Sequence, residues 1–361
     1  MNEYPPIGKT IEELRTQIDQ VDNDLVTLIS RRAELARAVG ALKDANDAIT
    51  FVPARERAVL AKVEANNKGL LPNEALRGIF QQIIASCRNL EQPVTVAYLG
   101  PEYTNTHVAA LSRFGTTGRY LAAESIGDII DLVEHGKAHY GVAPIENSTE
   151  GVVRETLDAL YRSTLNIADE LNMSIRHALY GKGKLEDVTE IYSHPQALAQ
   201  CRQWLHRCMP NAITIATSST SQAAMMVKIC PKAAAICQQL AAEQAGLNLL
   251  ADRIEDSAYN RTRFCVVGPA MSQPSGHDKT SIVFSVKHIA GSLNMALAVL
   301  QNRGINLTMI ESRPTKEMPW QYLFYIDLQG HVNDPNVTAA IEDMREHCLF
   351  LRVFGSYPEA N

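Results

Sequence analysis

The first forty residues carry a seam of apolar side chains that is interrupted by a single arginine. Alternating steps of three and four residues run from Ile11 to Leu42, and every seam position is aliphatic except Arg32. Such a repeat predicts one long helix with a coiled-coil-like apolar stripe. Burying a guanidinium among leucines is unfavourable unless an anion meets it. We therefore expect Arg32 to bind something negative or to pair with an acidic residue of another helix.

Two further cations flank this seam. Arg15 and Lys43 lie about 26 Å and about 16 Å from Arg32 along a straight helix that rises ~1.5 Å per residue. Lys43 and Arg32 can share one small anion, whereas Arg15 reaches it only from an antiparallel second copy. The spacing favours a homodimer with sites shared between chains. A structural seam with one internally paired arginine and solvated flanking charges is the alternative, and periodicity alone does not choose between them.

Composition narrows the classes of function. The chain has 361 residues, enough for two or three domains, and its net charge of −6 gives no support for nucleic-acid binding. No apolar run approaches the length of a membrane span, and residues 1–9 lack a signal-peptide core. Seven scattered cysteines match no zinc spacing and fit reduced thiols in a cytoplasm. We expect a cytoplasmic protein with no metal, cofactor, nucleic-acid or membrane partner.

Three segments of different character follow one another. Residues 1–92 hold the long helix and two shorter helical patterns without a strand signal. Over residues 93–270, strand-like runs alternate with helical stretches, which is typical of an α/β domain with mostly parallel sheets. Residues 271–279 form a polar linker with proline and glycine. Residues 280–361 follow the ferredoxin-like α+β order βαββαβ.

Motifs in all three segments resemble one family. Pro144–Ser148, Tyr192–Gln196 and Asp256–Phe264 are similar to segments of prephenate dehydratases. Glu311-Ser312-Arg313-Pro314 resembles the phenylalanine-binding motif of the ACT domains in these enzymes. The first segment resembles the chorismate mutase that precedes the dehydratase in bifunctional P-proteins. The resemblance covers nearly the whole chain and implies a two-lobed, periplasmic-binding-like dehydratase domain between a helical mutase and an ACT domain.

The resemblance implies a mutase site without a nucleophile or a metal. Chorismate rearranges to prephenate in a pericyclic step, so the site must hold a compact conformer and stabilise charge growing on the ether oxygen. Family arginines matching Arg15 and Arg32 clamp the carboxylates, with Arg15 supplied by the other subunit, and Lys43 reaches the ether oxygen. Arg55 and Glu56 match the family's Arg-Glu pair, in which the residue matching Glu56 accepts a hydrogen bond from the substrate hydroxyl.

This site departs from relatives at two positions. Glu91 stands where some relatives have a glutamine that donates to the ether oxygen, although other mutases use glutamate. A glutamate donates only when protonated, so we predict mutase activity that falls as the pH rises through neutrality. A solvated carboxylate near a helix end is the alternative. Val52 replaces an aspartate of some relatives, which leaves the hydroxyl contact to Glu56, and Cys87 is a further expected substrate contact.

In the dehydratase reaction, prephenate loses its ring carboxylate as carbon dioxide and its hydroxyl as water. The leaving oxygen needs a proton donor, a role that the resemblance assigns to Thr262. Arg263 is either a substrate clamp or a structural ion-pair partner, and the sequence leaves both open. The other expected substrate-binding residues match polar positions of the family's cleft: Thr104, Glu146, Asn147, Ser193 and Gln200.

One loop of this domain departs from the family pattern. Tyr103 replaces a turn glycine, and Asn105 replaces an aromatic residue. If the turn needs a positive φ, Tyr103 costs about 1–2 kcal/mol and directs a bulky side chain near the cleft. A mutase with an impaired, ligand-sensing dehydratase-like domain is therefore the alternative to a bifunctional enzyme. A non-enzymatic binding protein fits less well, because the five mutase positions from Arg15 to Glu56 match together.

The last segment carries both ligand motifs of a phenylalanine site. Besides residues 311–314, the stretch Gly291-Ser292-Leu293-Asn294 matches a second family motif, in which Gly291 lets the ligand approach the backbone. The resemblance implies feedback inhibition by phenylalanine bound between paired ACT domains. Asn294 replaces an apolar residue and puts the affinity in question. An ACT domain used only for dimerisation is the alternative.

Overall fold

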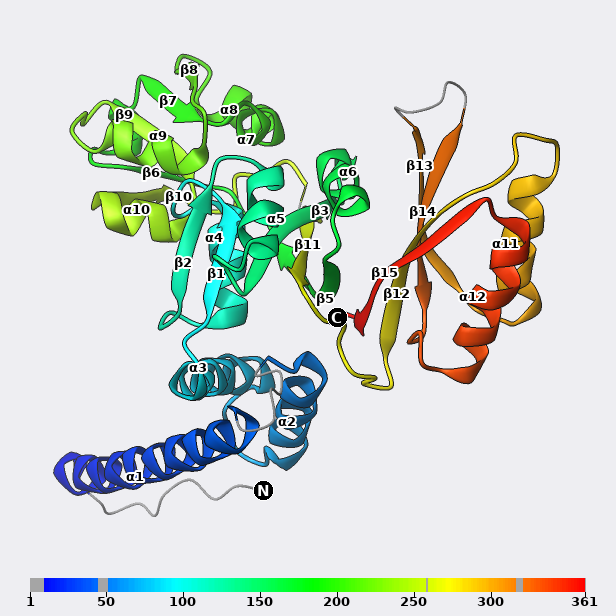
Figure 1. Ribbon diagram of the computed structural model, residues 1–361. Coiled ribbons are helices and arrows are strands. Elements are labelled where there is room, and N and C mark those ends of the chain that lie inside the picture. Colours follow the sequence, from blue (N-terminus) through cyan, green and yellow to red (C-terminus); the bar gives the residue numbers. More distant parts are fainter. Residues whose placement is uncertain (1–9, 45–50, 258, 316–320, 361) are drawn as a thin grey trace.

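The computed structural model describes residues 10–44, 51–257, 259–315 and 321–360. It contains an all-helical unit, a two-lobed α/β unit and an α+β unit, in this order along the chain (Figure 1). The predicted multidomain architecture is therefore confirmed. Both other units pack against the first lobe of the α/β unit, and α2 of the helical unit also contacts β15 of the α+β unit.

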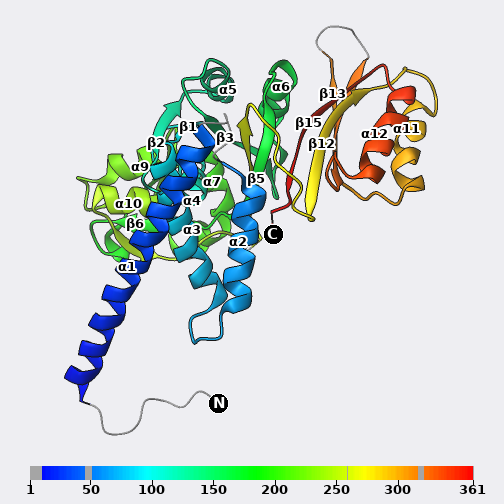
Figure 2. The same cartoon turned by 60° about the horizontal axis from the view of Figure 1, so that its bottom comes forward.

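The helical unit has one helix that is only partly packed. α1 spans Ile11–Asp44, α2 spans Pro53–Asn66 and α3 spans Asn73–Glu91. Pro53 lies in the first turn of α2, where a missing N–H costs no helical hydrogen bond. The C-terminal half of α1 lies against α3, whereas its N-terminal half extends away from the molecule (Figure 2). Its seam is open to solvent in the single chain, and Ile11 is 69% exposed.

The first lobe of the α/β unit is built on a mixed sheet. Its elements are β1 (Thr95–Leu99), α4 (Asn105–Phe114), β2 (Arg119–Ala123), α5 (Ile126–Glu134), β3 (Tyr140–Asn147), β4 (Gly151–Val152), α6 (Arg154–Arg162), β5 (Asn166–Ser174) and β11 (Arg261–Gly268). The strand order is β2-β1-β3-β11-β5, with β4 paired to β3. β1 is parallel to β2 and β3, but β11 is antiparallel to both of its neighbours. The expectation of mostly parallel sheets is wrong here, because the chain leaves this lobe through β5 and re-enters it through β11.

The second lobe is a smaller mixed sheet between the two crossings. Its elements are β6 (Ala178–Gly181), a short 3₁₀ helix (Leu185–Asp187), β7 (Glu190–Ser193), α7 (Pro195–Gln200), α8 (Arg202–Cys208), β8 (Ile213–Ala216), α9 (Thr220–Val227), β9 (Ala233–Cys237), α10 (Gln239–Ala245) and β10 (Asn248–Ala251). The strand order is β10-β6-β9-β7-β8. β7 is parallel to β8 and β9, whereas β6 is antiparallel to β9 and β10.

The α+β unit has the predicted βαββαβ order. Its elements are β12 (Asp278–Ser285), α11 (Ser292–Asn302), β13 (Leu307–Pro314), β14 (Tyr322–Gln329), α12 (Pro335–His347) and β15 (Phe350–Pro358). The antiparallel sheet has the order β13-β14-β12-β15. Both helices cover one face of the sheet (Figure 1). The other face joins the core of the first lobe, where Val283, Tyr325 and Phe354 cluster with Ile167 of β5.

Close backbone contact between β15 and β5 depends on one glycine. A Cβ placed on Gly355 would lie 2.2 Å from the carbonyl oxygen of Ile167. No side chain fits at that distance without separating the two strands. Gly355 therefore sets how closely the α+β unit docks on the first lobe.

We predict that Gly355→Ala lowers the free energy of unfolding by about 1–3 kcal/mol, the usual cost of overpacking a close contact. Urea unfolding followed by circular dichroism measures this loss. Gly78→Ala on α3 is the matched control, because nothing lies within 4 Å of the added Cβ. An alanine in the interior of this helix stabilises by up to about 1 kcal/mol. Equal stability of the two variants would contradict the proposed role of Gly355.

Candidate active sites

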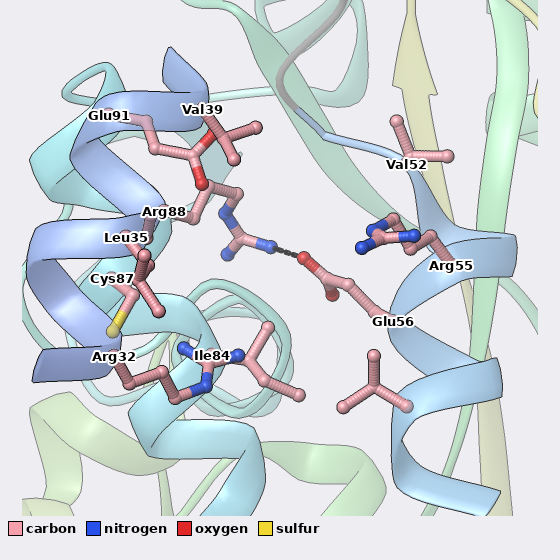
Figure 3. A pocket seen from close by; sticks show the side chains of 12 residues that line it. Arg32, Leu35, Val39, Val52, Arg55, Glu56, Ile84, Cys87, Arg88 and Glu91 are labelled. Carbon is pink, nitrogen blue, oxygen red and sulfur yellow. Dashed lines mark hydrogen bonds and ion pairs between the residues drawn. The ribbon is translucent and has the colours of Figure 1, made fainter. Parts of the chain in front are cut away.

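A pocket of about 440 Å³ opens between the three helices of the N-terminal unit (Figure 3). Helical spacing explains its lining, because residues three, four and seven apart share one face of a helix. Its twelve lining residues are Arg32, Leu35, Ala36 and Val39 of α1, Val52 before α2, Arg55, Glu56 and Val59 of α2, and Ile84, Cys87, Arg88 and Glu91 of α3.

Most of the predicted mutase residues meet in this pocket. Arg32 has no acidic partner at ion-pair distance among the described residues, which leaves its guanidinium available to an anion. Arg15 is exposed on the protruding part of α1 and does not line the pocket. The side chain of Lys43 lies outside the described residues. The predicted residues that line the pocket are Arg32, Val52, Arg55, Glu56, Cys87 and Glu91.

Glu56 is held between two guanidinium groups. Arg88 donates to its Oε1 (Figure 3), and Arg113 Nη1 donates to its Oε2 at 2.5 Å. Burial raises the pKa of Glu56, but the positive charges of Arg113 and Arg88 outweigh it and hold this pKa below its ordinary value. Glu56 is therefore a fixed, ionised hydrogen-bond acceptor. Sequence reasoning missed Arg88, because a lone arginine between Cys87 and a polar residue carries no signal of burial.

Glu91 lies at a close contact between α1 and α3. A Cβ on Gly40 would be 3.0 Å from the Cβ of Glu91, so the absence of a side chain there lets the helices meet. The carboxylate of Glu91 is directed into the pocket (Figure 3). The helix end that carries Glu91 is therefore packed against α1.

A second pocket of about 510 Å³ lies between the two lobes of the α/β unit. The first lobe contributes the ends of β1 and β3 and the start of β11, and the second contributes the starts of α7 and α9. Four of the predicted dehydratase residues line it, namely Thr104, Asn147, Gln200 and Thr262.

A chain of hydrogen bonds crosses this pocket from one lobe to the other. Asn147 Nδ2 donates to Thr262 Oγ1 at 2.9 Å and to Asn260 Oδ1 at 3.2 Å. Gln200 Oε1 accepts from Asn260 Nδ2 at 3.0 Å and lies 2.8 Å from His177 Nε2. Burial lowers the pKa of His177, although its hydrogen bond to Gln200 and the charge of Glu255 oppose this shift. The hydroxyl of Thr262 thus belongs to a network of neutral groups. His177 and Asn260 were not predicted as site residues. His177 lies outside the family-like motifs, and within the segment Asp256–Phe264 only Thr262 and Arg263 were given roles.

Three other predicted residues lie away from this pocket. Alternation along β11 sends Thr262 toward the pocket and Arg263 to the opposite face. Arg263 pairs there with Glu170 at 2.6 Å and more loosely with Glu146 at 3.4 Å. Ser193 is fully buried and donates to the carbonyl of Ile236 at 2.7 Å. Of the two readings of Arg263, the geometry favours the structural ion pair.

Comparison with known proteins agrees with this arrangement. Family models match in order: chorismate mutase type II over residues 14–92, prephenate dehydratase over 96–272 and the ACT domain over 280–346. A bifunctional chorismate mutase/prephenate dehydratase of Aquifex aeolicus is 42% identical, covering 97% of this chain and 98% of the relative. One of Neisseria gonorrhoeae is 41% identical, covering 98% and 99%. The chain belongs to the bifunctional chorismate mutase/prephenate dehydratase family.

The family membership makes the chain an enzyme with both activities, which serves phenylalanine biosynthesis. A solved prephenate dehydratase of Arthrobacter aurescens in complex with L-Phe is 36% identical with a TM-score of 0.68, and it covers 74% of this chain and 90% of its own. No helix among the described residues combines the length and apolar character of a membrane span.

The loop that departs from the family pattern of the dehydratase makes contacts across the lobes. Tyr103 has a φ of 65°, so the turn does require the left-handed backbone that a glycine adopts at less cost. The ring of Tyr103 packs against the core of the second lobe. Asn105 Oδ1 accepts a hydrogen bond from Gln238 Nε2 of that lobe at 2.6 Å. Both substitutions therefore add contacts between the lobes, while Thr104 and Asn105 still line the pocket.

The two expected phenylalanine motifs of the ACT domain lie apart within one chain. Ser292 and Leu293 line a pocket of about 350 Å³, and Gly291 adopts a φ of 86° at the start of α11. The second motif, on β13, instead faces α6 of the dehydratase domain. Arg313 donates to Asp158 at 2.7 Å. Glu311 lies 3.6 Å from Arg154. Neither Asn294 nor residues 311–314 are among the described residues that line the first pocket.

Proposed function

We propose that chorismate rearranges to prephenate in the pocket between the three helices, and that prephenate becomes phenylpyruvate in the pocket between the two lobes. The convergence of Arg32 of α1 with Arg55 and Glu56 of α2 carries the first assignment. The neutral network around Thr262 supports the second. The proposed domains are 1–92 for the mutase, 93–270 for the dehydratase and 280–361 for the ACT domain. Of the linker predicted over 271–279, the last two residues belong to β12 of the ACT domain.

In the mutase pocket, Arg32 and Arg55 bind the carboxylates of the chorismate dianion and favour its compact conformer. Glu56 accepts a hydrogen bond from the substrate hydroxyl, because two arginines keep its carboxylate negatively charged. Lys43 and the carboxyl group of Glu91 are proposed to contact the ether oxygen, where negative charge grows as the carbon–oxygen bond breaks. Val52 and Cys87 shape the remaining walls.

The proposed role of Glu91 predicts that the mutase activity depends on pH. A carboxyl group donates a hydrogen bond only in its protonated form, so we expect turnover to fall as the pH rises. Glu91→Gln keeps the donor at every pH and is expected to flatten the profile of kcat/KM between pH 5 and about pH 9. The rate of chorismate loss measures both profiles. A flat profile in the unmodified enzyme would exclude this role for Glu91.

The mutase site is proposed to be shared between two copies of the chain. Eight of the ten seam positions of α1 belong to exposed residues, which a second copy would cover. They are Ile11, Ile18, Val21, Leu25, Leu28, Leu35, Val39 and Leu42. Arg15 stands on the same unpacked helix, about 26 Å from the Arg32 of its own chain at ~1.5 Å per residue. An antiparallel partner brings its Arg15 to this pocket and completes the carboxylate clamp.

Mixing two inactive variants tests this sharing. Co-expressed Arg15→Ala and Arg32→Ala chains form hybrid dimers in which one of the two sites has both arginines intact. We expect the mixture to recover about one quarter of the normal mutase activity, since half of the randomly paired dimers are hybrids. Arg32→Ala mixed with Arg55→Ala is the control, because these residues line the pocket of one chain and no hybrid site is intact. Equal activity of the two mixtures would contradict a shared site.

In the dehydratase pocket, Thr262 is proposed to protonate the leaving hydroxyl. The bond to the ring carboxylate breaks, its electron pair completes the aromatic ring, and the hydroxyl departs as water. The threonine oxygen then regains a proton from solvent. Asn147 holds the threonine, and Gln200 and Thr104 orient the substrate. Glu146, Ser193 and Arg263 support this site from outside the pocket.

The ACT domain is proposed to bind phenylalanine and to inhibit the enzyme. The L-Phe complex of the Arthrobacter aurescens dehydratase and the pocket at Ser292 and Leu293 support this proposal. Pairing of two ACT domains would bring residues 311–314 of one copy to the pocket of the other. Inhibition requires that phenylalanine binds a less active state more tightly. We also propose that the enzyme is cytoplasmic, because its seven cysteines are free among the described residues.

One assay with prephenate tests the dehydratase and its regulation together. We expect the enzyme to form phenylpyruvate, measured by its absorbance in alkali, and phenylalanine to slow this formation. Thr262→Val is expected to reduce kcat by about 10²–10⁴-fold, while Thr262→Ser keeps the hydroxyl and most of the activity. Mutase turnover of the same preparations reports on folding. Absence of phenylpyruvate from the unmodified enzyme would indicate a dehydratase impaired at Tyr103 and Asn105.

A further inference from the structure

Glu56, which lines the mutase pocket, is held by a hydrogen bond from a residue outside the mutase domain. Arg113, which donates to Glu56, belongs to α4 of the dehydratase domain. Its Nε donates to Asp169 Oδ2 on β5 at 2.5 Å. Asp169 is 0% exposed, and its other oxygen accepts from Arg57 Nη2 at 2.8 Å. Glu56 and Arg57 are neighbours on α2, so the backbone between them closes a ring of four side chains with alternating charge across the domain boundary.

The ring fixes Arg113 in position. The guanidinium has a carboxylate on two sides, and it also lies 4.6 Å from the centroid of the Phe51 ring. The Arg113 side chain is 14% exposed, and that of Glu56 is 13% exposed. Water therefore screens this pair little. The loss of Arg113 would leave Glu56 with Arg88 alone, and the loss of Glu56 would leave Arg113 with Asp169 alone.

We propose that Arg113 is a positioning residue of the chorismate mutase site, supplied by the dehydratase domain. Arg113 does not line the pocket and acts through Glu56, whose orientation and charge it fixes. The mutase site is thus complete only when α4 is docked on the helical unit. This inference rests on the proposed role of Glu56 as the acceptor of the substrate hydroxyl.

The groups around Glu56 decide how its charge depends on Arg113. Arg88 of α3 contacts Oε1 of Glu56, the oxygen that Arg113 does not contact. Arg55 precedes Glu56 on α2. Across the pocket stand Arg32 of α1 and Glu91 of α3. Behind Arg113 lie Asp169 of β5 and Arg57 of α2. Without Arg113, Arg88 is the only cation among the described residues that pairs with the carboxylate, and burial then favours the protonated form more strongly.

The test is the pH profile of chorismate turnover by the full-length enzyme. We expect Arg113→Gln to lower kcat/KM about 10-fold and to move the acid limb of the profile up by about one pH unit, the scale on which a contacting charge shifts a carboxyl group. Arg113→Lys restores the charge and should move the limb part of the way back. Arg77→Gln is the matched control, because Arg77 pairs with Glu64 of α2 at 2.5 Å and does not line the pocket. Its profile should equal that of the unmodified enzyme.

Two further variants keep the outcome decisive. If Arg113→Gln does not fold, as judged by circular dichroism and by dehydratase turnover, Asp169→Asn replaces it. This change leaves Arg113 in place but removes the opposing negative charge, so the acid limb should move to lower pH. The proposal would be overturned if the folded Arg113 or Asp169 variant kept the acid limb of the unmodified enzyme and Glu56→Gln nevertheless abolished turnover. Normal turnover by Glu56→Gln would instead refute the proposed role of Glu56 itself, and the inference with it.

Discussion

Two adjacent buried carboxylates on β5 connect the three domains. Asp169 and Glu170 are 0% and 2% exposed, and alternation along the strand sends them to opposite faces of the first-lobe sheet. Asp169 is neutralised by arginines of the mutase domain and of α4, whereas Glu170 binds Arg263 and Lys279. An uncompensated buried charge costs several kcal/mol, so each carboxylate requires its neighbouring domain in place. The same strand also receives the close approach of β15.

Arg263 links Glu170 to the ACT domain by ion pairs on both sides. This arginine contacts Glu170 at 2.6 Å, Asp327 of β14 at 2.5 Å and the hydroxyl of Tyr357 at 2.9 Å. Burial opposes the charge of Arg263, but Tyr357, Asp327 and Glu170 outweigh it and raise its pKa. Its neighbour Thr262 faces the dehydratase pocket. One residue step along β11 thus separates the proposed proton donor from the ionic contact with the regulatory domain.

The helical part of the structure could be predicted from the sequence. The seam of α1 depends on local periodicity, and the interruption at Arg32 marked the pocket. By contrast, β5 has the sequence Asn-Ile-Ala-Asp-Glu-Leu-Asn-Met-Ser and lacks the apolar run of a buried strand. Its charges are buried because partners distant in the sequence neutralise them, and no local pattern reports such partners. Arg88 and His177 were missed, and the prediction of mostly parallel strands was wrong, because these features also depend on partners distant in the sequence.

The order of partners around β5 has a consequence for the nascent chain. The partners of Asp169, which are Arg57 and Arg113, precede it in the sequence, so they leave the ribosome first. The partners of Glu170 follow it by 93 residues for Arg263 and 109 for Lys279. During synthesis, the carboxylate on one face of β5 is therefore paired early. The carboxylate on the other face stays unpaired until β11 emerges with Arg263, and Lys279 at the start of the ACT domain follows it. At about 5–20 residues per second this interval lasts roughly 5–20 seconds, during which the incomplete sheet edge is open to mispairing or to a chaperone.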